Sequence, residues 1–488
     1  MPTLVDDDAA GVGAPVDPTP PVPDRSRLRR TMAVVALLVG LAALAGIGST
    51  AAIGAQVTAD EPYYLLTAGS LFERQDLDIG PDLRAESYRD YHQAELPQQT
   101  APLPGGQRLS PHDPLLPAIL AVPFGLGGWL GAKLAMVAIA AALAALLVWT
   151  ATVRFGVPLG VAATVVAGFG VVPPLAAYGT QIYPELPAAL AVTLAIAAVT
   201  GPAARDTTTA WVLAVVALPW LAVKYAPVAV ALALVGLAVV AATRRRGLLA
   251  GALIGLVLSA VAFAAFHQAV YGGWTVYAAG NHFGGGELTV MGESPDYASR
   301  AQRLTGLLTD HDFGLLAWAP AFLAAVPAAA ALVRRRPPGW LALGLPLGAG
   351  WLNATFVALT MHGWWWPGRQ VVVVVPCLVL AVAWWLGNLV RDLRWRPWFL
   401  AASGFGLLAW LWLQVEVARG TSTIIIDFAR TTNPSSKLWR LLLPDLRVMA
   451  GVDLARTTGW VVAFVALAVW GWRRGAPEAV AGPGADGS

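Results

Sequence analysis

Long apolar runs separated by short clusters of arginine recur from one end of this sequence to the other. Runs of about 18 or more apolar residues are long enough to cross a bilayer as helices, and their recurrence excludes a soluble domain with a single anchor. The composition agrees, because 57% of the residues are hydrophobic and only 12% are charged. The sequence therefore predicts an all-α polytopic membrane protein.

The arginine clusters predict how these helices are oriented, since Lys and Arg in short loops favour the cytoplasmic side. We expect a transmembrane domain over residues 31–472, a disordered cytoplasmic tail at 1–30 and a second cytoplasmic tail at 473–488. About 12 crossings with both ends cytoplasmic place every short-loop cluster, such as 244–246, on one side. The expected helices cover about residues 31–57, 131–153, 157–177, 186–200, a hairpin within 205–244, 247–271, 313–333, 340–360, 370–389, 397–418 and 457–472. The expected outer loops are about 58–113, with short interfacial helices, 272–312, 361–369 and 419–456.

Several kinds of chemistry leave no trace in the chain. Cys377 is the only cysteine and lies in an apolar run, so we expect no intrachain disulfide. The sequence has no Walker motif, no dinucleotide fingerprint and no zincin motif. A net charge of +3 gives no indication of nucleic-acid binding. We therefore expect no cofactor, no metal and no nucleic-acid partner, and a lipid bilayer as the surroundings.

Two adjacent carboxylates, Asp60 and Glu61, follow directly on the first apolar run. Carboxylates at the end of a membrane helix are costly next to lipid, so we expect them to face a cavity or water. Pro62 and the following Tyr63 and Tyr64 predict that a short amphipathic helix starts here, on the membrane surface. The alternative is that Asp60 only caps this helix.

Polar residues at or near membrane depth gather in the half of the protein that this topology places outside. They are Asp60, Glu61, His112, Asp113, Glu185, Lys224, His267, His282, Asp310, His311, Asp312, His362, Arg369 and Glu416. The inner half has only the orienting arginines. A conduit would place polar groups along its whole depth, so this one-sided distribution favours chemistry at the outer surface.

Two isolated cations, Lys224 and Arg369, stand among aromatic residues at the outer boundary. Such a cation is suited to a lipid phosphate, because the charge binds the anion and the rings pack on the lipid chain. The alternative is that each side chain only extends to the outer headgroups. His282 with Glu287, and His311 between two aspartates, are possible metal ligands, but solvated loop residues explain them as well.

Five segments carry a resemblance to a known family. They are residues 60–64 (DEPYY), 110–116 (SPHDPLL), 183–187 (YPELP), 314–320 (GLLAWAP) and 363–369 (GWWWPGR). In this order they resemble the GT-C superfamily of membrane glycosyltransferases, and more closely its branch with the protein O-mannosyltransferases and the lipid A aminoarabinose transferase.

The resemblance implies transfer of a hexosyl or pentosyl group, with inversion, from a polyprenyl-monophosphate carrier at the outer face of the cytoplasmic (inner) membrane. Asp60 would be the catalytic carboxylate that accepts the acceptor's hydroxyl proton, and Glu61 would orient the acceptor or Asp60. Lys224 and Arg369 would bind the donor phosphate. Further candidates for the substrate cavity are Tyr63, Tyr64, His112, Asp113, Glu185, His362 and Trp365. The short outer segment 419–456 favours a lipid or glycan acceptor over a protein.

Two other functions fit parts of the pattern. A glycolipid transporter or flippase would need a polar path to the cytoplasmic face. A ligase-type transferase with a lipid-diphosphate donor would use an outer arginine and histidine late in the chain, here Arg369 and His362.

Overall fold

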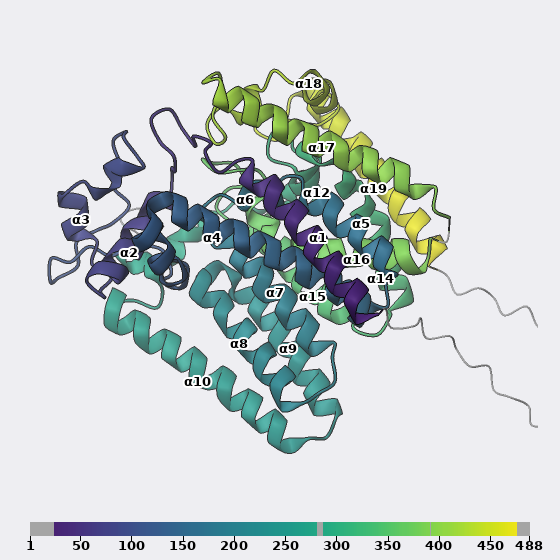
Figure 1. Cartoon of the computed structure of the whole chain (residues 1–488), viewed down its shortest axis with the longest axis horizontal. Coiled ribbons are helices and arrows are strands. Elements are labelled where there is room, and N and C mark those ends of the chain that lie inside the picture. The colour runs from purple at the N-terminus through teal and green to yellow at the C-terminus, as the bar shows by residue number, and fades with distance from the viewer. Residues whose placement is uncertain (1–23, 281–285, 391, 476–488) are drawn as a thin grey trace, which may run out of the picture.

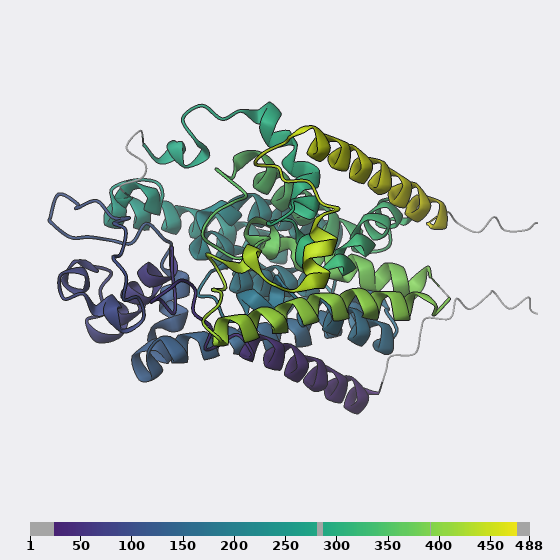
Figure 2. The same ribbon diagram turned by 90° about the horizontal axis from the view of Figure 1, so that it is seen from above.

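The computed structural model describes residues 24–280, 286–390 and 392–475 (Figures 1 and 2). All regular elements in these ranges are helices, and the only β-pairing in them is a few isolated bridges. The expected all-α fold is therefore confirmed. Most of the two predicted tails lies outside the described residues, as does His282.

Every expected crossing contains a helix. The long helices are α1 (Arg25–Leu44), α4 (Leu115–Phe155), α5 (Leu159–Gly170), α7 (Glu185–Val199), α8 (Arg205–Leu221), α9 (Ala226–Ala242), α10 (Arg246–Tyr271), α14 (Ala325–Arg335), α15 (Trp340–Leu352), α16 (Val375–Asn388), α17 (Trp395–Ala418) and α19 (Gly451–Arg474). Among the described residues, 7 helical stretches are long and apolar enough to span a membrane, and α5 and α7 are shorter apolar helices. The number of crossings and their orientation stay predictions.

The first helix differs from its expected bounds at both ends. It begins at Arg25 rather than near residue 31, because Asp24 caps it by accepting a hydrogen bond from the backbone N–H of Ser26 (3.1 Å). It ends at Leu44 rather than near residue 57. The following residues, rich in glycine, serine and alanine, fold back in turns, with a bridge between Ala52 and Ala55. The first loop therefore starts about four turns of helix earlier than expected.

Helix α4 contains the interfacial and spanning segments that the sequence separates. Gly128 divides them, with backbone angles of φ 58° and ψ −153° that an L-residue with a side chain rarely adopts. Five residues before this break, Pro123 removes one backbone donor from the helix. The break lets the first part of α4 pack along α2 (Glu61–Glu73), while the second part crosses the bundle beside α1.

Short helices of the loops gather at the ends of the long ones (Figure 1). Helices α2 and α3 (Gly80–Arg84) lie together at one end of the molecule, and residues 61–68 of α2 are all buried. Helix α16 lies at the centre and is almost entirely buried, whereas α10 lies at the edge and buries few of its residues. Helices α17 and α19 flank the bundle along its length (Figure 2).

Candidate active site

Asp60 occupies the cap position of α2, but its side chain makes no capping hydrogen bond. Its Oδ2 instead accepts a hydrogen bond from Nη2 of Arg369 at 2.6 Å. The residue before it, Ala59, has φ 56°, in the left-handed region where side chains are disfavoured. The capping alternative therefore does not account for the direction of this carboxylate, which contacts a cation 309 positions away in the sequence.

Arg369 is the centre of the charged cluster. It starts a 3₁₀ helix, η7 (Arg369–Val374), and its side chain is only 8% exposed. The guanidinium carbon lies 4.3 Å from the ring centre of Tyr183 and 4.8 Å from that of Trp365. Nε donates to Oε1 of Glu185 at 2.9 Å. The two rings and two carboxylates fix the plane of the guanidinium, which a lysine in its place would not reproduce.

Lys224 lies at the tip of the predicted hairpin, in a short 3₁₀ turn, η2 (Val223–Tyr225), between α8 and α9. Its Nζ donates to the same Oε1 of Glu185 at 2.6 Å. The tip is held from both sides, because Val223 N–H donates to Asp113 Oδ2 at 2.9 Å and Asn353 donates to the Lys224 carbonyl at 3.1 Å. Asp113 also pairs with His267 at 3.2 Å.

Two carboxylates and two cations thus form one chain of contacts, in the order Asp60, Arg369, Glu185 and Lys224. The formal charges of these four side chains cancel. Glu185 is fully buried, and a lone charge there would be strongly destabilising. We call these four residues the site cluster.

Burial alone would raise the pKa of the Asp60 carboxyl, but the Arg369 guanidinium and the other nearby cationic groups hold that pKa well below its usual range. Asp60 is therefore ionised at neutral pH. His112 stacks on Tyr64 with a centroid distance of 4.7 Å, and its Nε2 lies 3.1 Å from Gln99 Oε1. Burial lowers the pKa of His112 to about 4, against the opposite effect of Asp60, so the imidazole is neutral at pH 7.

Glu61 points away from Asp60 and bonds to the backbone. Its Oε2 accepts the N–H of Thr58 at 3.0 Å, and its Oε1 accepts the N–H of Ile182 at 2.8 Å. Burial raises the pKa of Glu61, and nearby Lys133 opposes that effect. Glu61 thus ties the start of α2 to the turn that carries Tyr183 and Glu185.

The remaining candidates divide between this site and other places. Tyr64 and Trp365 lie at the site cluster, through the Tyr64–Tyr183 ring contact at 6.3 Å and the Trp365–Arg369 contact. The Tyr63 hydroxyl donates to the Pro97 carbonyl at 2.8 Å and so holds the first loop. His362 pairs instead with Asp310 at 3.2 Å. Tyr183 and Tyr225 were not selected from the sequence, although each lies within two residues of a selected charge.

Asp310 and His362 belong to a second polar cluster, together with His311, Asp312, Arg440 and Arg447, which we call the loop cluster. Its two aspartates and Arg440 are buried, whereas Arg447 is exposed. Asp312 bonds to His311 at 2.9 Å and also to Arg440 and Arg447. These contacts join the residues before α13 (Leu315–Trp318) to the segment around α18 (Pro434–Arg440). Among the described residues no group of three or more His, Cys, Asp and Glu side chains is arranged to hold a metal ion.

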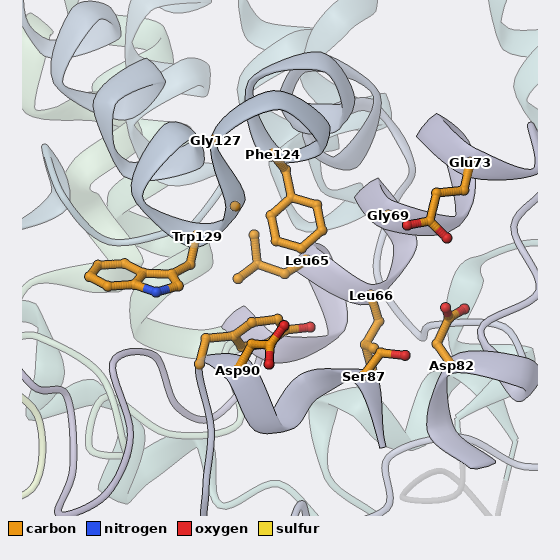
Figure 3. Close-up of a pocket in the computed structure, with 12 residues that line it drawn as sticks. Leu65, Leu66, Gly69, Glu73, Asp82, Ser87, Asp90, Phe124, Gly127 and Trp129 are labelled. Carbon is orange, nitrogen blue, oxygen red and sulfur yellow. The ribbon is translucent and has the colours of Figure 1, made fainter. Parts of the chain in front are cut away.

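A cavity of about 380 Å³ lies beside α2, bounded by the break in α4 and by η1 (Ser87–Asp90) (Figure 3). Phe124 and Trp129 line one part of it, and Asp82 and Asp90 line another. No member of the site cluster lines it. Leu66 faces this cavity, whereas Tyr64 faces His112. Helix α2 therefore lies between the cavity and the site cluster.

Fold and site together define a polytopic membrane protein with a buried ion-pair cluster at the ends of its helices. Two crystal structures of ArnT from Cupriavidus metallidurans are similar to it. The structure bound to undecaprenyl phosphate has a TM-score of 0.50 and 13% sequence identity, over 92% of this chain and 78% of that chain. The apo structure has a TM-score of 0.52 and 14% identity, over 92% and 77% of the two chains.

Neither a protein-family model nor a curated protein sequence matches the chain. At this level of identity the similarity to ArnT establishes the fold alone. The chain therefore shares the polytopic membrane fold of ArnT, and the expected helical membrane fold is confirmed.

Proposed function

We propose that this protein is a membrane glycosyltransferase that moves a hexosyl or pentosyl group from a polyprenyl-monophosphate carrier to an acceptor hydroxyl. The observation that carries this proposal is the direct contact between Asp60 and the buried Arg369, which Glu185 links to a second cation, Lys224. A base and a phosphate-binding pair are the groups that such a transfer needs side by side. The fold, shared with a protein crystallised with undecaprenyl phosphate, supports a lipid-linked donor.

Three members of the site cluster have a direct role in this reaction. The acceptor oxygen attacks the anomeric carbon, with Asp60 taking the hydroxyl proton. The bond from that carbon to the phosphate oxygen breaks, and the electron pair leaves with the polyprenyl phosphate. Lys224 and Arg369 stabilise the negative charge that develops there. A single displacement of this kind inverts the configuration of the anomeric carbon.

The ion pair between Asp60 and Arg369 couples donor binding to the base. In the structure, Arg369 keeps the pKa of the Asp60 carboxyl low, which makes Asp60 a weak base. A donor phosphate bound to Arg369 partly neutralises the positive charge of the guanidinium next to Asp60. The pKa of Asp60 then rises toward the range in which a buried carboxylate can accept a proton.

The site cluster lies at helix ends that the arginine distribution assigns to the outer side. Asp60 precedes α2, Glu185 begins α7, Lys224 joins α8 to α9, and Arg369 precedes α16. We therefore place the reaction at the outer face of the cytoplasmic membrane. The acceptor is a lipid or a glycan, because the described outer segments are short helices and turns without a separate folded domain.

The test is to incubate the purified protein with a panel of polyprenyl-phosphoryl sugars and acceptor lipids, and to measure consumption of the donor. Asp60→Asn should reduce turnover by at least a thousandfold while the protein remains folded. Asp90→Asn, which changes an exposed carboxylate in the cavity on the other side of α2, serves as the matched control and should retain full turnover. An active Asp60→Asn enzyme, or translocation of the lipid without chemical change, would overturn the proposal.

A further inference from the structure

Several buried polar groups around the two cations have no hydrogen-bond partner among the described residues, and three of these are oxygen atoms of the site cluster or of tyrosines beside it. They are Oε2 of Glu185 and the hydroxyls of Tyr183 and Tyr225. Glu185 and Tyr183 are 0% exposed, and Tyr225 is 2% exposed. Each belongs to the site cluster or touches it, because the Tyr183 ring lies over Arg369 and the Tyr225 ring lies 5.3 Å from Lys224 Nζ.

One buried tyrosine next to these groups does satisfy its hydroxyl. Tyr178, whose ring is 6.1 Å from that of Tyr183, donates to the Trp366 carbonyl at 2.7 Å. A buried polar group without a partner costs about 1–3 kcal/mol, and native folds rarely leave several of them together. Their concentration beside a proposed phosphate site indicates that a polar ligand completes them.

The chemistry of the three groups restricts what that ligand brings. An ionised Glu185 can only accept hydrogen bonds, so the group next to Oε2 must carry an O–H or N–H. A phosphodiester anion has no such donor and would be repelled by the carboxylate. Tyrosine hydroxyls both donate and accept, as do the hydroxyls of a sugar.

We propose that Glu185, Tyr183 and Tyr225 form the sugar subsite of the donor site, where they hydrogen-bond the hydroxyl or amino groups of the transferred sugar. This inference rests on the proposed function. It assigns the cations and the uncharged hydroxyls of the site to different parts of the donor. Lys224 and Arg369 face the phosphate, while Oε2 of Glu185 and the two hydroxyls face the sugar. Glu185 thus joins both halves, holding the cations with one oxygen and the sugar with the other.

A subsite of this kind makes the protein prefer a lipid that carries its sugar. The bare lipid phosphate leaves the three polar groups unpaired, and sites built to bond a hydroxyl discriminate strongly against ligands that lack it. Removing one tyrosine hydroxyl should reduce this preference without changing how the phosphate is held.

The experiment measures the affinity of the purified protein for undecaprenyl phosphate and for undecaprenyl-phosphoryl hexoses and pentoses. The wild-type protein should bind at least one sugar-bearing lipid more tightly than the bare lipid. Tyr183→Phe and Tyr225→Phe should each weaken binding of that sugar-bearing lipid by about tenfold, and binding of the bare lipid by less than about twofold. Tyr178→Phe, which removes a hydroxyl that is already bonded, is the control and should leave the preference unchanged.

Two results would overturn the sugar subsite. One is that the two tyrosine variants bind both lipids equally more weakly than the wild type, or bind both as tightly as the wild type does. The other is a wild-type protein that binds bare undecaprenyl phosphate but prefers no sugar-bearing lipid, and in that case the lipid-phosphate part of the proposed function stands. A wild-type protein that binds neither kind of lipid would instead overturn the proposed function itself.

Discussion

The site cluster and the loop cluster each combine a buried carboxylate with a buried arginine and neighbouring polar groups, but they differ in how fully their carboxylates are bonded. In the loop cluster, Asp310 accepts backbone N–H groups of Asp312 and Phe313 on one oxygen, and His362 and the Leu446 N–H on the other. In the site cluster, one oxygen of Glu185 holds two cations and the other has no partner among the described residues.

The difference supports the proposal that the site cluster binds a ligand, whereas the loop cluster holds two loops together. A network that satisfies every acceptor has nothing left for a ligand and gains by holding two loops together. A network with free acceptors and hydroxyls beside compensated charges is incomplete until a ligand enters. Burial and ion pairing alone would make the two clusters equally good candidates for a binding site. They are distinguished by how many of their polar atoms have a hydrogen-bond partner.

The largest effect is expected from Arg369→Met, which removes the centre of the site cluster. It leaves Asp60 without its cation and takes away one of the two groups proposed to hold the phosphate. Transfer should fall by at least a thousandfold, measured as consumption of the lipid-linked donor. Arg440→Met in the loop cluster is the matched change, and its folded fraction should keep turnover within a few fold of the wild type.

A second prediction concerns the loop cluster, where a substitution should reduce stability and leave activity nearly unchanged. Asp312→Asn leaves the buried Arg440 without its carboxylate, and breaking a buried pair costs about 3–5 kcal/mol. The melting temperature in detergent should drop clearly, while kcat/KM of the protein that remains folded stays near the wild-type value. Loss of kcat/KM without loss of stability would contradict this role of the loop cluster.

A third prediction uses the ligand to compensate a missing charge. Glu185→Gln removes the carboxylate that pairs with both cations, so the variant should melt at a lower temperature than the wild type. Undecaprenyl phosphate supplies a new anion, so it should raise the melting temperature of Glu185→Gln more than that of the wild type. An equal or smaller shift in the variant would show that the lipid phosphate does not reach these cations.

The smallest expected effect is the pH dependence contributed by His112. Its pKa is about 4 in the folded protein and 6.5 in an unfolded chain, so the folded state binds fewer protons between these values. Stability should therefore be constant above about pH 7 and decrease as the pH falls from 6.5 toward 4. The melting temperature of His112→Asn should decrease less over this window, and parallel curves for the two proteins would contradict the assignment.

Much of the fold and part of the site could be predicted from the sequence. The apolar runs and arginine clusters predict a helix in every expected crossing, and the structure has one in each. The interruption of the apolar run at Lys224 correctly predicts the hairpin of α8 and α9. Asp60, Lys224 and Arg369 could be selected because charges next to long apolar runs are costly and therefore conspicuous. Tyr183 and Tyr225 could not, because a tyrosine at a helix end is ordinary in a membrane protein.

Side-chain partners were the part that the sequence left open. Glu61 stands next to Asp60 in the chain, but it bonds to the Ile182 backbone, while Asp60 reaches Arg369. His362 lies only seven positions from Arg369, yet it belongs to the loop cluster. Neighbouring residues at the start of a helix point in different directions, so their partners depend on which other helix packs there.

The sequence by itself determined that this chain is a bundle of membrane helices with charged residues at the ends of several of them. Only the tertiary structure decided which of those charges meet and which polar atoms remain without a partner. The physical reason is that apolar patterning sets the length and burial of each helix, whereas lipid is as apolar as the helices and does not dictate how they pair. Packing of side chains and hydrogen bonds between helices makes that choice, and it brought residues 60, 185, 224 and 369 together.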